Sequence, residues 1–300
     1  MFIWIIGLVL VVLMIAMGLP IAFSMLIIGF LGLVTLIGLD PALAMIGQIF
    51  FDNGMNYTLS ILPLFLLMGN FVVRAGLADD LYNSANAWLR HKKGGLAMAT
   101  IIACGGFSSV CGSSLATAAT MAKIALPSMK KYNYPDSLAT GAIAAGGTLG
   151  ILIPPSMILV LYGIITSQDI GQLFLAGIIP GLLGILGYII AVKISVLTNI
   201  KSFKTQSALP LIERIKSLKG VLGIISLFIL VMGGIYSGVF TATEAAGVGA
   251  FGSLIIVLIK RKITLNSFYE TLIETAKVTS MLFFLLFGAI LFSNFINLAG

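Results

Sequence analysis

The sequence predicts an all-α polytopic membrane protein. Of its 300 residues, 59% are hydrophobic and 9% are charged, and the mean hydropathy of +1.14 exceeds that of soluble globular domains. The apolar residues fall in long runs, as spanning helices require, rather than in the short alternating segments of a membrane β-barrel. The 17 basic residues outnumber the 10 acidic ones. They cluster between apolar runs, which indicates topology determinants rather than contact with nucleic acid.

Three spans are expected before the first basic cluster. Residues 2–38 are interrupted by Gly18-Leu19-Pro20. A single helix of that length would measure about 55 Å against a bilayer core of about 30 Å, so two spans with a tight turn are expected. Residues 40–56 are expected to form a polar or interfacial connection. The third span is residues 57–74, with a kink at Pro63.

Residues 94–129 predict a re-entrant hairpin. The apolar run 94–106 would form a helix of about 20 Å, too short to cross the bilayer, and the serine-rich stretch Phe107–Ser114 follows it. Basic clusters flank the segment at 90–93 and 130–131. Because basic clusters favour the cytoplasmic side, the chain between them is expected to enter the membrane and return.

Residues 137–168 predict a helix that is broken about halfway across the membrane. Gly146, Gly147 and Gly150 loosen it, and Pro154-Pro155 removes two backbone donors. Irregular backbone at that depth is tolerated only where it is buried in protein or lines a cavity. Two broken elements in succession are typical of a transporter binding site.

The remaining chain is expected to alternate spans with cytoplasmic segments. In order these are a span at 172–198, a cytoplasmic connector at 201–219, spans at 220–238 and 241–259, an amphipathic segment at 263–277 and a last apolar run at 278–298. Counting sides from the basic clusters places the N-terminus outside. Thr241 and Glu244 fit a helix capping box, which we prefer to a proton-relay role for Glu244.

The two breaks supply the candidate binding site. The hairpin tip offers serine hydroxyls and freed carbonyls, and hard cations prefer oxygen ligands. The helix N-termini at Gly112–Ser114 and Pro154–Ser156 direct partial positive charge at the break, which suits an anionic substrate. The candidate ion- and substrate-binding residues are Ser108, Ser109, Gly112, Ser113, Ser114, Thr117, Gly147, Thr148, Pro154 and Pro155, with Na⁺ expected at Ser109, Ser113, Gly147 and Thr148.

A purely structural role is the alternative for several of these side chains. Ser113 or Ser114 could cap the returning helix, and Ser113, Thr117 and Thr120, which share one face of it, could bond back to their own helix. Lys123 lies inside the returning helix and is expected to extend toward the cytoplasmic face.

Neither an enzyme nor a resident cofactor is expected. The sole histidine, His91, lies in a basic loop, and no GxxxxGK[ST] phosphate cradle is present. Cys104 and Cys111 lack the spacing of a metal or redox site. A remote alternative is an intramembrane serine hydrolase that uses Ser113 or Ser114, although no histidine lies in a span to act as its base.

Several motifs occur in a fixed order along the chain. They are GGLAMAT, FSSVCGSSLATAAT, AAGGTLGILIPPSMILVLYG, LFLAGIIPGLL and GIYSGVFTATEAAGVGAF. With them the chain resembles the large membrane subunit of TRAP (tripartite ATP-independent periplasmic) transporters, the DctM-like family, most densely over residues 94–183. Three positions depart from the family pattern: Cys111 stands where Ser is common, and Ser128 and Asn133 stand where Glu and Gly are usual.

The resemblance implies a function, partners and a location. It implies Na⁺-coupled uptake of organic anions, often carboxylic acids, by an elevator mechanism, with Na⁺ as coupling ion. It also implies a periplasmic substrate-binding protein and a small four-helix membrane subunit as partners in the bacterial inner membrane. The alternative within transport is a divalent-anion/Na⁺ symporter that works without a binding protein.

The family is built from two inverted repeats, which the resemblance maps onto residues 1–200 and 220–300. The first repeat begins near residue 2 and its hairpin near residue 94. The same offset from residue 220 places a second hairpin beyond residue 300. The second repeat is therefore expected to be truncated, and the sequence to be a fragment.

Overall fold

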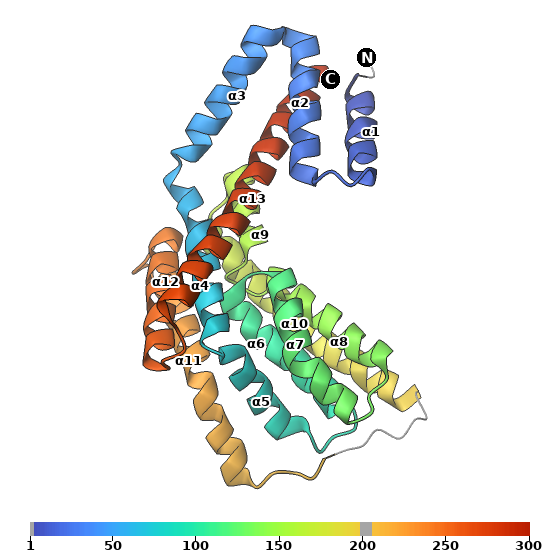
Figure 1. Cartoon of the computed structure of the whole chain (residues 1–300), viewed down its shortest axis with the longest axis vertical. Coiled ribbons are helices and arrows are strands. Elements are labelled where there is room, and N and C mark those ends of the chain that lie inside the picture. Colours follow the sequence, from blue (N-terminus) through green and yellow to red (C-terminus); the bar gives the residue numbers. More distant parts are fainter. Residues whose placement is uncertain (1–2, 199–205) are drawn as a thin grey trace. The chain divides into compact units, whose positions relative to one another are not determined.

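The computed structural model describes residues 3–198 and 206–300, and within them the chain is helical with no strand (Figure 1). In chain order the elements are α1 (Ile3–Ala16), α2 (Ile21–Ile37), α3 (Leu39–Gly54), the 3₁₀ turn η1 (Tyr57–Ser60), α4 (Ile61–Arg74), α5 (Leu77–Leu89), α6 (Gly95–Cys111), α7 (Ser114–Lys131), α8 (Asp136–Thr148), the 3₁₀ turn η2 (Leu149–Ile151), α9 (Met157–Thr166), α10 (Ile170–Thr198), α11 (Leu211–Tyr236), α12 (Ala242–Ile259) and α13 (Leu265–Ala299).

Among the described residues, five helical segments are long and apolar enough to cross a bilayer. They are Tyr57–Arg74, Ile170–Thr198, Leu211–Tyr236, Ala242–Ile259 and Leu265–Ala299. The apolar helices α1, α2, α6 and α9 are shorter. The all-helical, membrane-spanning class predicted from composition is therefore confirmed.

The first compact unit contains residues up to Ser60 together with Ile273–Gly300. Its helices are α1, α2, α3 and the C-terminal part of α13. Gly18 has a φ of +92° and Pro20 precedes α2, so the predicted turn between the first two helices is confirmed. Aromatic and aliphatic side chains form the core of this unit. Phe287 is buried there, and the partly buried Phe50 packs against it with ring centroids 4.5 Å apart.

The second compact unit, Ile61–Leu272, contains α4 to α12 and the first turns of α13. Phe71, Phe107 and Phe174 are fully buried in it. An ion pair between Arg74 and Glu270 (3.2 Å) ties α4 to α13, and a second pair between Lys260 and Asp80 ties the end of α12 to α5.

The structure adds detail to several expected elements, and it corrects the role of Pro63 and the start of the span after the connector. Pro63 lies in the first turn of α4, where its missing N–H leaves no helical hydrogen bond unmade, rather than at a kink in mid-helix. The connection at 40–56 is itself helical, as α3. Residues 263–277 and 278–298 belong to one continuous helix, α13, because no proline separates them. Helix α11 begins at Leu211, inside the connector expected at 201–219, and residues 201–205 of that connector lie outside the described part.

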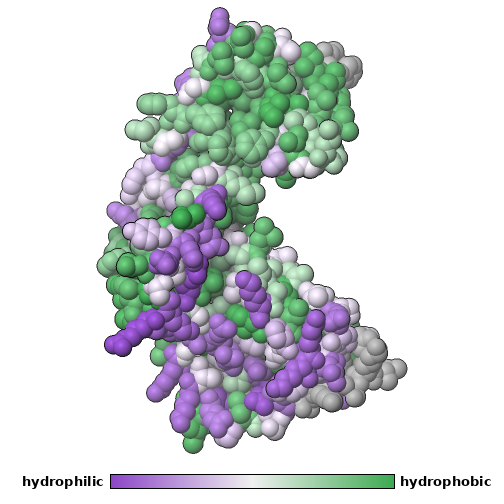
Figure 2. Space-filling view, in the orientation of Figure 1, coloured by the Kyte–Doolittle hydropathy of each residue, from purple (hydrophilic) through white to green (hydrophobic). Residues whose placement is uncertain are grey.

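Polar side chains are unevenly distributed within the second unit. Figure 2 shows hydrophilic side chains gathered over the ends of α7 and α11, and α7 ends in Lys130 and Lys131. The loop between α7 and α8 is tied to the start of α6, because Leu96 N–H donates to the Tyr134 hydroxyl at 3.3 Å. Burial raises the pKa of Tyr134, and this hydrogen bond opposes the rise.

Candidate functional site

The first break in the helices is short. Helix α6 runs on through the serines to Cys111, and α7 begins at Ser114, so the turn consists of Gly112 and Ser113. Gly112 has a φ of +63°, the left-handed conformation that ends a helix and favours glycine. The expected long tip from Phe107 to Ser114 is therefore wrong. Ser108 and Ser109 lie within α6, and their side chains do not disrupt its backbone hydrogen bonds.

The second break lies where the prolines predict it. Helix α8 ends at Thr148, η2 follows, and α9 begins at Met157. Pro154 and Pro155 between them are buried. The Ile153 N–H still reaches the Leu149 carbonyl at 2.9 Å, so helical hydrogen bonding stops at the residue before the diproline.

Both helices that leave the breaks begin with a serine N-cap. Ser113 and Ser156 have extended backbone, and their hydroxyls accept from Ala116 N–H and Leu159 N–H, each at 3.4 Å. The Ser156 hydroxyl also donates to the Ile151 carbonyl at 2.7 Å, which closes the second break on itself. The capping role expected for Ser113 is thus confirmed.

The two breaks are in direct contact. The Gly112 carbonyl accepts from Met157 N–H at 3.3 Å, and a Cβ atom at position 112 would lie 2.6 Å from the Pro155 carbonyl oxygen. A Cβ at Gly150 would lie 2.7 Å from the Ser113 carbonyl oxygen. The N-termini of α7 and α9 therefore begin beside each other, and glycines permit the approach.

Helix α8 packs on α7 through a third small residue. A Cβ at Gly147 would lie 2.7 Å from the Ala118 Cβ and 3.2 Å from the Ser114 carbonyl oxygen. Behind the first break, α4 approaches closely, because a Cβ at Gly69 would lie 3.1 Å from the Cys111 Cα. The hairpin end of α6 and α7 is therefore in contact with α4, α8 and η2.

Two hydroxyls at the hairpin end are buried without a hydrogen-bond partner among the described residues. They belong to Ser108 in the last turn of α6 and Thr117 in the first turn of α7, and both residues are 0% exposed. The Thr117 hydroxyl lies beside the Cys111 thiol. An unsatisfied buried hydroxyl is costly, so oxygen atoms in this position are available to a ligand.

The hydroxyls of two other predicted ligands already form hydrogen bonds. The Ser109 hydroxyl donates to the Gly106 carbonyl at 2.7 Å. The Thr148 hydroxyl donates to the Ala145 carbonyl and shares a hydrogen bond with the Tyr188 hydroxyl, each at 2.7 Å. Thr148 therefore faces α10 whereas Gly147 faces α7. The four residues expected around Na⁺ are not all joined by contacts, and their role as ligands stays a prediction.

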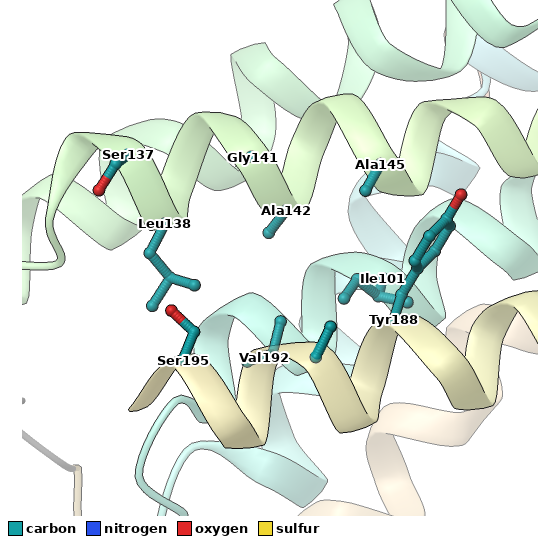
Figure 3. Close-up of a pocket in the computed structure, with 10 residues that line it drawn as sticks. Ile101, Ser137, Leu138, Gly141, Ala142, Ala145, Tyr188, Val192 and Ser195 are labelled. Atoms are coloured by element: carbon teal, nitrogen blue, oxygen red, sulfur yellow. The ribbon is translucent and has the colours of Figure 1, made fainter. Parts of the chain in front are cut away.

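A cavity of about 260 Å³ lies between α8 and α10, with α6 behind it. Figure 3 shows Leu138, Ala142 and Val192 directed into it, Tyr188 at one end and Ser137 with Ser195 at the other. Its interior is apolar. The Tyr188 end adjoins Thr148, so the cavity flanks the second break.

Three residues at the second break are absent from the predicted site: Ser156, Gly150 and Tyr188. Ser156 follows a diproline at the start of an apolar run, which is a recognisable N-cap signal. Gly150 and Tyr188 carry no local signal, because their roles come from contacts with distant segments.

Glu244 and Lys123, two charged residues considered in the sequence analysis, lie outside the two breaks. Glu244 forms the predicted capping box at the start of α12: Thr241 N–H donates to its carboxylate at 2.8 Å, and Glu244 N–H donates to the Thr241 hydroxyl at 3.3 Å. The capping interpretation is confirmed. Lys123 is exposed on α7.

Comparison with known families gives one match across residues 8–300, to the model described as tripartite ATP-independent periplasmic transporter, DctM component.

Characterised relatives point the same way. The chain is 39% identical over 245 residues to the C4-dicarboxylate TRAP transporter large permease protein DctM of Pseudomonas aeruginosa. The matched region covers 81% of this chain and 57% of that protein. It is 34% identical over 284 residues to the sialic acid TRAP transporter large permease protein SiaM of Vibrio cholerae (92% and 64%). It is 32% identical over 278 residues to the 2,3-diketo-L-gulonate TRAP transporter large permease protein YiaN of Escherichia coli (92% and 64%). The chain thus spans somewhat more than half the length of these permeases.

Proposed function

The chain belongs to the DctM component family of tripartite ATP-independent periplasmic (TRAP) transporters, and on this premise we propose that it is the large membrane subunit of a secondary transporter for organic anions. Family membership and the apolar helices make it a multi-pass membrane protein. The proposed location is the bacterial inner membrane. Relatives of this family are named permeases and not enzymes.

The contact between the two breaks is the observation that carries this proposal. The N-termini of α7 and α9 meet where Gly112 accepts from Met157. Free N–H groups and the helix dipole make such ends favourable for anions. A substrate carboxylate near Ser113 and Ser114 would be bound by backbone N–H groups in the first turn of α7, without a buried cationic side chain.

The relatives support a carboxylate-bearing substrate. Their names give C4-dicarboxylate, sialic acid and 2,3-diketo-L-gulonate. The relative with the C4-dicarboxylate name shares the larger identity among these three. We therefore propose C4-dicarboxylates as the substrates to test first.

Na⁺ is the proposed coupling ion, and the residues at the hairpin end fit a hard cation. The orphaned hydroxyls of Ser108 and Thr117 are oxygen donors, as are the backbone carbonyls near Gly147 and Ser113. Bound there, the ion would supply positive charge beside the carboxylate. The Ser109 and Thr148 hydroxyls donate to carbonyls of their own helices, and their oxygens keep lone pairs with which they could join it.

The partners and mechanism are proposals on the same premise. A periplasmic binding protein would deliver the anion, and a small four-helix membrane subunit would complete the membrane complex. The segment 94–129 would be a re-entrant hairpin of the first of two inverted repeats. It would move together with the broken helix as an elevator.

Uptake into proteoliposomes tests the proposal. The chain is reconstituted with its small subunit, and radiolabelled C4-dicarboxylate is supplied with or without the binding protein under an inward Na⁺ gradient. We expect accumulation that needs both the gradient and the binding protein. Accumulation without the binding protein would favour the alternative symporter. Failure to accumulate any organic anion under a Na⁺ gradient would contradict the proposed function.

A further inference from the structure

A second apolar groove lies on the other side of α6, away from the breaks. It has a volume of about 360 Å³ and is formed by one face each of α5, α6 and α11. Its principal lining residues are Leu81, Ala85, Trp88, Ile102, Leu218 and Val221. It is open on its outer side, where Trp88 is 39% and Leu218 is 43% exposed.

The groove follows an antiparallel pair of helices. Ser84 of α5 meets Ser217 of α11 through their hydroxyls at 3.4 Å. Three residues further along α11, a Cβ at Gly220 would lie 3.0 Å from the Asp80 Cβ, one turn earlier on α5. The groove thus has one end near Trp88 and the other near Leu81, about 10 Å apart at the helical rise per residue.

Positive charge is concentrated at the Trp88 end. The Arg214 guanidinium lies over the Trp88 ring, 6.0 Å from its centroid. Arg90 follows α5 directly, and its Nε is buried without a partner in the described residues. The Arg214 Nε donates to the Leu209 carbonyl, and among the described residues neither arginine forms an ion pair.

Acidic side chains do not neutralise this end. Glu213 is the carboxylate next to Arg214 in sequence, and it is exposed. Asp80 lies at the opposite end of α5 and is paired with Lys260. An apolar groove therefore leads to two arginines that form no ion pair within the described part of the chain.

We propose that this groove binds an anionic phospholipid. One acyl chain lies along Leu81, Ala85 and Val221, and the phosphate lies against Arg214 beside Trp88. Tryptophan is enriched at the level of lipid headgroups, and arginine binds phosphate through parallel N–H donors. Basic pockets between membrane helices are typical sites for anionic headgroups. The cavity in Figure 3 and this groove are both lined by uncharged residues, and the groove differs in having the Arg214 guanidinium beside its Trp88 end.

Native mass spectrometry of the full chain in mild detergent tests the proposal. The chain is given equal amounts of phosphatidylglycerol and phosphatidylcholine with identical acyl chains. We expect adducts mainly of phosphatidylglycerol. Arg214→Gln should weaken phosphatidylglycerol binding about tenfold, as loss of a charge-assisted contact predicts, and should weaken phosphatidylcholine binding less, because the choline ammonium already offsets the charge of that lipid's phosphate. Ala85→Leu should fill the groove and reduce binding of both lipids.

Two controls are matched to these variants. Lys216→Gln removes an exposed charge from α11 outside the groove, and Ala191→Leu fills the cavity of Figure 3. Neither should alter lipid binding, and soluble glycerol 3-phosphate should not displace the lipid. Equal phosphatidylglycerol binding by Arg214→Gln and Lys216→Gln, at equal melting temperature, would overturn the proposal. If Ala85→Leu unfolds, the comparison of Arg214→Gln with Lys216→Gln is sufficient to test the proposal.

Discussion

Single glycines control how closely the two breaks approach. At Gly112 two requirements coincide: a positive φ, and a neighbour, the Pro155 carbonyl, that leaves no room for a Cβ. At Gly150 the second requirement applies, since a Cβ would lie 2.8 Å from the Ser113 carbonyl carbon. Backbone from one break therefore lies against backbone from the other, and any side chain would separate the two helix N-termini.

Gly112→Ala is expected to destabilise the chain and to abolish anion binding. The left-handed conformation alone costs alanine about 1–2 kcal/mol, and the overlap with Pro155 adds to it. Thermal unfolding measures the first effect and substrate-induced stabilisation the second. Gly141→Ala is the matched control, because a Cβ there meets nothing within 4 Å, and alanine in a helix should be neutral or slightly stabilising. Equal melting temperatures for the two variants would contradict the packing described.

Thr117→Val tests whether the Thr117 hydroxyl is an ion ligand or has a purely structural role. Among the described residues, the buried Thr117 hydroxyl has no hydrogen-bond partner except the weak Cys111 thiol beside it, so a methyl group in its place should lower the melting temperature in KCl little. If the hydroxyl binds Na⁺, NaCl should raise the melting temperature of the unmodified chain above its value in equimolar KCl, and Thr117→Val should lose that increase.

Thr120→Val, one turn further along α7, is the control for Thr117→Val and should keep the full increase. A Na⁺ effect that survives in Thr117→Val would exclude this hydroxyl as a ligand.

At the scale of helices, local chemistry explains which features the sequence predicts. Prolines and capping residues act on their immediate neighbours, so the break before Pro154 and the capping box at Thr241 are both predictable from the local sequence. The sequence predicts too long a hairpin tip, because serine is disfavoured in helix interiors, whereas α6 continues through Ser108 and Ser109. Ser109 instead bonds back to Gly106 within its own turn. Contacts such as Thr148 with Tyr188 span 40 positions, and no local pattern encodes them.

The capping box at α12 distinguishes two roles for Glu244. Glutamine can accept from the Thr241 N–H as glutamate does, whereas alanine cannot. Glu244→Gln should therefore keep the melting temperature near that of the unmodified chain and leave the pH dependence of uptake unchanged, while Glu244→Ala and Thr241→Ala lower stability. The loss for Thr241→Ala should be about 1 kcal/mol. A flattened pH profile in Glu244→Gln at unchanged stability would instead indicate a proton-relay role.

At the scale of the whole chain, the path through the membrane is the strongest remaining expectation from the sequence. The described residues bring the two ends of the α6–α7 hairpin together, because Leu96 near one basic cluster contacts Tyr134 near the other. Both clusters should then lie on one side of the membrane, on the cytoplasmic side by their charge. The broken helix leads from that side to the loop between α9 and α10, which should lie on the opposite side.

Cysteine labelling in intact cells tests this path. Single cysteines replace Lys92, Lys131 and Gln168, and an impermeant thiol reagent is applied before and after the membrane is opened. Cys104 and Cys111 are buried, with 0% and 4% exposure, so the background should be low. We expect labelling at position 168 in intact cells, and labelling at 92 and 131 only after opening. Labelling of positions 92 and 131 from opposite sides would show that residues 94–129 cross the membrane, and the re-entrant hairpin would then be wrong.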